Sequence, residues 1–176
     1  GWAVGQFLIL ELPLPWREDP LQSRSVPPGV RETLMSLWDD NIDVGLFGVA
    51  PDAAYSVAEK LRVMSFDFAA NPGGSAVRLD YLVPVEQVAT TIDALARRHP
   101  VPSSVEIDNT PYQDAMICTH GSRDACCATF GFPLYRKLRA RSTELSNLRV
   151  WRATHFGGHR FAPTMMTFPD GRSWGY

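Results

Sequence analysis

Residues 118–127 read Cys-Thr-His-Gly-Ser-Arg-Asp-Ala-Cys-Cys, and residues 155–159 read His-Phe-Gly-Gly-His. All three cysteines of the chain lie in the first segment, and two of its four histidines lie in the second. Each segment is predicted to follow a strand directly, in a loop that contains glycine. Loops held by a rigid scaffold are where binding and catalytic residues concentrate. We therefore interpret the two segments as the two halves of one metal site, and the rest of the chain as its scaffold.

The residue types in these segments are those of metal ligands. Eight residues separate Cys118 from Cys127, and three separate His155 from His159. Two thiolates and two imidazoles suffice for a closed tetrahedral zinc site, and they also match the mixed ligation of some iron–sulfur clusters. The intervening Gly157-Gly158 favours a loop between the histidines, because glycine suits tight turns rather than helix interiors. If the interpretation is right, all four side chains must converge in the folded protein.

Length and composition describe an ordinary globular protein. Of its 176 residues, 45% are hydrophobic and 20% are charged, enough for one sizeable core or two small ones. The formal net charge is −2 without a run of Lys or Arg, so neither nucleic acid nor an anionic membrane is expected as a partner. No apolar stretch approaches the roughly 20 residues that span a bilayer. Clustered cysteines beside histidines favour a reducing compartment, and we expect a cytoplasmic protein without a signal peptide.

The first half of the chain alternates strand and helix patterns. The predicted elements are a strand over 6–12, a helix over 30–38, a strand over 44–49, a short helix over 53–59, a hairpin over 61–83 and a helix over 85–98. The last helix is the best defined, because Glu86 lies at its start, arginines lie at its end and Pro100 stops it. This order of elements is that of a small α/β unit with thioredoxin-like connectivity.

The second half predicts a shorter copy of the first. Residues 100–111, rich in Pro, Ser, Asp and Asn, are predicted to be a linker. The elements that follow are a strand over 114–117, a helix that begins near Pro133, a strand over 148–153 and a hairpin over 164–176. We therefore expect an α/β fold of two thioredoxin-like units in tandem, with mixed β-sheets flanked by helices. Residues 1–104 would form the N-terminal domain and residues 105–176 the C-terminal domain. The closing helix of the second unit would lie beyond Tyr176, so we expect the chain to be a fragment.

Other interpretations of the same residues explain less of the pattern. A Rieske centre needs a second Cys with a His close behind it, but the next histidine after Cys127 is His155. A thiol oxidoreductase would use Cys126-Cys127 near a predicted helix start, without the usual Cys-x-x-Cys motif. A Cys–His nucleophile leaves the second cysteine and the second histidine unexplained. A structural zinc site uses the same four ligands and stays open as an alternative.

The same segments resemble the sucrase/ferredoxin-like family, above all its bacterial "sucrase ferredoxin" members. The resemblance is specific over residues 118–127, 131–134, 155–164, 168–171 and 174–176, and weaker over residues 8–16. It implies a thioredoxin-like ferredoxin domain whose [2Fe–2S] cluster is held by two cysteines and two histidines, in an arrangement distinct from Rieske. The matching motif positions imply Cys118, Cys127, His155 and His159 as ligands, with Cys126 as a neighbour.

The resemblance also implies a function. It indicates an electron-transfer protein, rather than a stand-alone enzyme, that acts on a redox partner protein which the sequence does not identify. We find no pair of catalytic carboxylates that would support sucrase activity. Two neutral imidazoles in place of two thiolates leave the oxidised cluster less negative, so its potential should exceed the roughly −400 mV of plant-type ferredoxins, with reduction coupled to proton uptake. An exposed cluster is lost to oxygen, so protein purified in air is expected to lack it.

Overall fold

The computed structural model describes residues 5–145 and 147–176. Within these residues the strands form one nine-stranded mixed sheet, in the order β5-β4-β3-β1-β2-β7-β6-β8-β9. The strands are β1 (Gln6–Glu11), β2 (Gly45–Val49), β3 (Lys60–Asp67), β4 (Val77–Pro84), β5 (Glu106–Ile107), β6 (Gln113–Cys118), β7 (Leu148–Ala153), β8 (Met165–Phe168) and β9 (Arg172–Trp174). The α-helices are α1 (Val30–Asp39), α2 (Val88–Ala96) and α3 (Ala125–Ser142). The α/β class is therefore as predicted.

The two halves of the chain have the same strand connectivity. In the first half, β1 and β2 are parallel and joined through α1, while β3 pairs antiparallel with β1 and β4 antiparallel with β3. In the second half, β6 and β7 are parallel and joined through α3, while β8 pairs antiparallel with β6 and β9 antiparallel with β8. The thioredoxin-like order expected from the sequence thus occurs twice. A division into separate domains at residues 104 and 105 stays a prediction.

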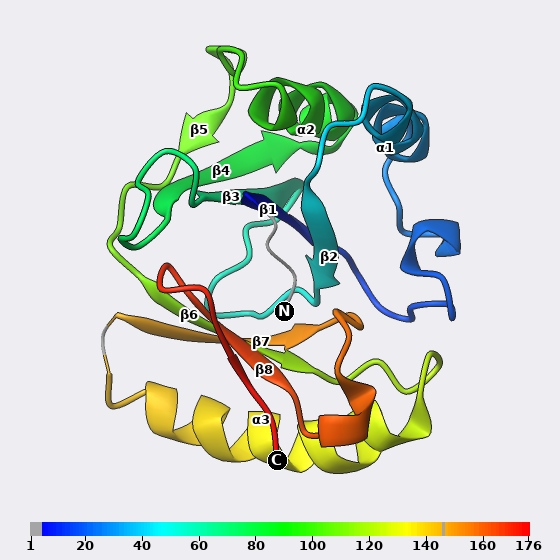
Figure 1. The fold of residues 1–176 in the computed structure, drawn as a ribbon, viewed down its shortest axis with the longest axis vertical. Helices are drawn as coiled ribbons and strands as arrows, with labels where there is room; N and C mark the ends of the chain where they lie inside the picture. Colours follow the sequence, from blue (N-terminus) through cyan, green and yellow to red (C-terminus); the bar gives the residue numbers. More distant parts are fainter. Residues whose placement is uncertain (1–4, 146) are drawn as a thin grey trace.

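The halves meet along β2 and β7, which are equivalent strands of the repeat. The Ala50 N–H donates to the Arg152 carbonyl oxygen at 2.9 Å, and the Thr154 N–H donates to the Gly48 carbonyl oxygen at 2.8 Å. The sheet folds back on itself at this junction, so that the two half-sheets face each other (Figure 1). Helices α1 and α2 cover one outer side, and α3 covers the other (Figure 1).

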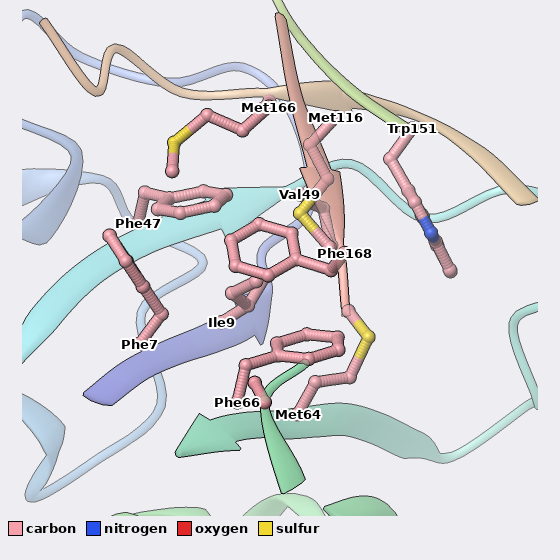
Figure 2. Packing of buried hydrophobic residues seen from close by; sticks show 12 residues of the cluster. Phe7, Ile9, Phe47, Val49, Met64, Phe66, Met116, Trp151, Met166 and Phe168 are labelled. Atoms are coloured by element: carbon pink, nitrogen blue, oxygen red, sulfur yellow. The ribbon is translucent and has the colours of Figure 1, made fainter. Parts of the chain in front are cut away.

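Side-chain alternation along the strands divides the core into layers. Phe7 and Ile9 of β1 point between the half-sheets, whereas Leu8 and Leu10 pack under α1 and α2. The central layer draws on both halves and is rich in aromatic and methionine side chains. Its members include Phe7, Phe47, Met64, Phe66, Met116, Trp151, Met166 and Phe168 (Figure 2). The two halves therefore share one hydrophobic core.

Three local predictions are wrong. The segment over residues 53–59 forms turns rather than a helix. The predicted linker contains β5, a two-residue edge strand that pairs with β4 through its backbone, so its polar composition concealed it. Helix α3 begins at Ala125, well before Pro133, which lies inside the helix. The Asp124 side chain caps the helix start there, and this N-cap was a better signal than the proline.

A buried network of charged side chains also joins the halves. Arg149 of β7, which is 1% exposed, donates to the Asp114 carboxylate of β6 at 2.7 and 2.9 Å. The same guanidinium pairs at 2.9 Å with Asp80 of β4, which belongs to the first half. The indole N–H of Trp151 donates to Asp114 at 2.7 Å. Buried charges of this kind are tolerable only when paired, so the network favours one orientation of the half-sheets.

Replacing Asp114 with Asn should lower the free energy of unfolding by about 1–3 kcal/mol, because the buried Arg149 keeps its pair with Asp80 but loses its charged partner on β6. Urea unfolding would measure this loss. The Glu106→Gln variant is the control, because it removes an exposed pair with Lys60 and should cost less than about 1 kcal/mol. Similar small losses in both variants would contradict a stabilising role for the network.

Candidate metal centre

The two cysteines predicted as ligands lie at the end of a strand and the start of a helix. β6 ends at Cys118, and Cys127 lies in the first turn of α3. Both side chains are 1% exposed. Asp124 caps the helix by accepting the Cys126 N–H at 3.0 Å, which satisfies a backbone donor that the helix leaves free. The cap therefore fixes the turn that carries Cys127 beside the strand end.

The close approach of α3 to β6 depends on Gly131. A Cβ atom at this position would lie 1.9 Å from the carbonyl oxygen of Cys118. Glycine is thus required where the helix crosses the strand end. Gly131 belongs to a motif that resembles the family, residues 131–134. The sequence does not reveal its packing role, because the contact is between a helix and a strand that are separate elements.

His155 follows β7 and brings an imidazole to the two thiols. Its Nδ1 lies 3.5 Å from the sulfur of Cys127 and 3.8 Å from the sulfur of Cys118. The three donor atoms all lie within 4.8 Å of one another. In a tetrahedral site with metal–sulfur bonds of about 2.3 Å and metal–nitrogen bonds of about 2.0–2.1 Å, sulfur and nitrogen are about 3.6 Å apart. The observed spacing therefore fits three ligands of one metal ion.

His159 does not belong to this group of three. It lies in the short 3-10 helix η3 (His159–Phe161), is exposed to solvent, and its ring centroid is 5.7 Å from that of His155. The intervening Gly157 and Gly158 have φ angles of 97° and 71°, left-handed conformations that glycine adopts without strain. The predicted glycine loop is thus present. The structure groups three of the four predicted ligands and leaves the fourth beside them on the solvent side.

Cys126 is not part of the group of three donor atoms. Its thiol donates to the carbonyl oxygen of His159 at 3.3 Å, which links the start of α3 to the histidine loop. Hydrogen bonding with Asp124 raises the pKa of Cys126 to about 11, so the thiol keeps the proton that this bond requires. The geometry therefore favours Cys127 over Cys126 as the second sulfur ligand.

The electrostatic environment keeps the unbound site uncharged. Burial raises the pKa of Cys127 to about 12 and also raises the pKa of Cys118, so both are thiols at neutral pH. Burial, followed by the neighbouring His159, lowers the pKa of His155, which keeps its imidazole neutral as a metal ligand requires. Reactive cysteines have lowered pKa values, so these thiols do not resemble those of a thiol oxidoreductase. A bound metal cation would replace the thiol protons.

A third histidine, His120, contacts the backbone of His155. It is buried, its Nδ1 accepts the backbone N–H of His155 at 3.2 Å, and its Nε2 donates to the carbonyl oxygen of Arg17 at 2.8 Å. The ring of Trp16 contacts it edge-on, with centroids 5.6 Å apart. His120 thus connects the loop after β1 to the residue that carries the imidazole ligand. The sequence predicts His120 to be a loop residue or a neighbour of the ligands, and its hydrogen bond with His155 makes it such a neighbour.

Comparison with known proteins agrees with these features. The model of the sucrase/ferredoxin-like family matches residues 3–176. This protein belongs to the sucrase/ferredoxin-like family. A segment of 72 residues is 35% identical to altered inheritance of mitochondria protein 32 of Meyerozyma guilliermondii, and it covers 38% of this chain and 26%, about a quarter, of that protein. No solved structure matches the chain.

The family membership and the Cys–His group together support a ferredoxin-like redox role or a metal-binding role. The donor set fits a metal cofactor in its chemistry, because thiolates and a neutral imidazole are ligands of zinc and of iron–sulfur clusters. Among the helices of the described residues, none has the length and apolar character needed to cross a membrane.

Replacing Gly131 with Ala should push α3 away from β6 and separate the Cys127 sulfur from that of Cys118. We expect at least tenfold weaker binding of Co²⁺, measured by its absorption with thiolate ligands, together with a lower unfolding midpoint. Gly5→Ala is the matched control, because a Cβ there would meet its nearest neighbour at an ordinary 3.8 Å. Unchanged Co²⁺ binding in Gly131→Ala would show that this close approach does not shape the site.

Proposed function

We propose that this protein is an electron carrier that holds a [2Fe–2S] cluster through Cys118, Cys127, His155 and His159. The observation that carries the proposal is the convergence of two buried thiols and one imidazole nitrogen within 4.8 Å, with a second imidazole alongside. When bound, such a cluster accepts one electron and gives it back. The cysteines would hold it on the buried side, and the histidines would hold it towards the solvent.

The size of the hydrophobic core supports a redox role over a purely structural metal. Structural zinc is typical of domains too small to build a sufficient core. Here the half-sheets are packed on their inner faces against each other and on their outer faces against helices. The site lies at the edge of this core, and exposed His159 gives it an open side. A redox partner protein needs such an open side in order to approach the cluster.

A mononuclear zinc site with the same ligands is the second candidate. The sulfur–nitrogen separations of 3.5 and 3.8 Å already fit one tetrahedral ion. A cluster of two irons is wider, so the histidine loop would have to open to admit it. Gly157 and Gly158 give that loop the necessary backbone freedom. Visible absorption separates the candidates, because an iron–sulfur protein is red-brown and a zinc protein is colourless.

The proposed partner is another redox protein that approaches the histidine side of the site. We propose neither a nucleic acid nor a membrane as a partner, and we propose an electron carrier rather than a sucrase or other stand-alone enzyme. The proposed location is the cytoplasm. The three cysteines, all free thiols, are consistent with a reducing compartment.

Anaerobic reconstitution with iron and sulfide tests the ligand assignment. The native protein should bind iron and sulfide in equal amounts and absorb visible light. Cys118→Ser and Cys127→Ser should each lose nearly all of the bound iron, because each removes one of four ligands, whereas the control Cys126→Ser should retain it. Loss of iron in Cys126→Ser but not in Cys127→Ser would contradict the assignment. Tight binding of zinc with no uptake of iron would favour the second candidate.

The reduction potential should fall as pH rises. The outer ring N–H groups of His155 and His159 would lose protons more readily when the cluster is oxidised, so reduction takes up a proton. Over the coupled range the slope should approach about 59 mV per pH unit, the value for one electron and one proton. His159→Cys should lower the potential, because it adds negative charge, and weaken the slope. A potential that does not vary with pH would contradict histidine ligation.

A further inference from the structure

Thr164 lies between the histidine loop and β8, directly beside the end of β6. Its carbonyl oxygen accepts the backbone N–H of Cys118 at 3.1 Å. Its side chain is 6% exposed, and its methyl carbon is 3.3 Å from where a Cβ on Gly158 would lie. Thr164 is thus enclosed between the strand that carries one sulfur and the loop that carries the histidines.

The hydroxyl of Thr164 has no hydrogen-bond partner of normal geometry among the described residues. A buried hydroxyl left in this state costs about 1–3 kcal/mol, so its retention needs an explanation. Cys118 lies directly opposite Thr164, because β6 and β8 are antiparallel and Ile117 pairs with Met165, so the two side chains are neighbours on one face of the sheet. A neutral thiol is a weak acceptor, whereas a thiolate is a stronger one.

We propose that Thr164 is a positioning residue whose hydroxyl donates a hydrogen bond to the metal-bound sulfur of Cys118. In the thiol form the hydroxyl stays unsatisfied, and loss of the thiol proton on metal binding supplies the acceptor. The inference rests on Cys118 being a ligand, as proposed above, and applies whether the metal is iron or zinc.

Two effects follow from such a bond. It stabilises the thiolate and therefore strengthens metal binding. It also draws electron density from the sulfur, which favours the more negative reduced state and raises the reduction potential of a cluster. Thr164 would thus tune the centre without being one of its ligands.

Titration of the full chain with Co²⁺ tests the inference without requiring an iron–sulfur cluster. Thr164→Val, which removes the hydroxyl and keeps the shape, should bind Co²⁺ about tenfold more weakly. Its sulfur-to-cobalt absorption band should move to longer wavelength, because the thiolate becomes easier to oxidise. Thr164→Ser should restore both properties. Thr91→Val is the control: Thr91 lies in α2, is 0% exposed, and its hydroxyl likewise lacks a partner among the described residues.

The unfolding midpoint of the metal-free protein separates this role from a structural one. Thr164→Val should not lower that midpoint, because the variant removes a buried hydroxyl without a partner. In the reconstituted cluster protein the same variant should reduce the equilibrium constant for reduction about tenfold, which corresponds to about 59 mV for one electron.

Two outcomes would overturn the inference in different ways. Native affinity and an unshifted band in Thr164→Val would refute the hydrogen bond and leave the proposed function standing. A folded native protein that shows no sulfur-to-cobalt band would refute Cys118 as a ligand, and the proposed function would fail with it.

Discussion

The packing of the two half-sheets against each other is the interaction on which the rest of the structure depends. Phe66 of β3 stacks on Phe168 of β8 with ring centroids 4.3 Å apart, so the contact joins the two halves of the chain. Burial of this aromatic and methionine layer from water supplies most of the driving force for the arrangement. It fixes β2 beside β7 and therefore determines where the strands that lead to the candidate site end.

The two ends of the parallel strands β6 and β7 carry residues with different roles. Near their amino ends Asp114 and Arg149 form the buried ion pair. At their carboxyl ends Cys118 and His155 reach the same edge of the sheet, where parallel strands commonly place ligand-binding residues. The charged network and the candidate metal centre thus lie at opposite ends of one pair of strands. The two cysteines lie on a strand and a helix, whereas the histidines lie in the segment after β7.

The candidate site combines a buried thiol side with an exposed imidazole side. The unbound site holds protons in place of a metal, because burial disfavours both thiolates. Gly131 sets the approach of the helix, His120 holds the backbone of His155, and the carbonyl oxygen of Thr164 accepts the Cys118 N–H. Local sequence patterns do not reveal the contacts of these three residues, since each contact is with an element distant in the chain.

The sequence by itself determined the residue types of the site, the repeated order of strands and helices, and the glycine loop between the histidines. Each of these follows from a local pattern in the sequence: apolar periodicity, turn residues or the spacing of potential ligands. Only the tertiary structure decided that the two half-sheets join into one, that β5 pairs at the edge within a polar segment, and that His159 lies apart from the other three donors. Those features depend on contacts between residues far apart in the chain, and neither periodicity nor spacing encodes such distances.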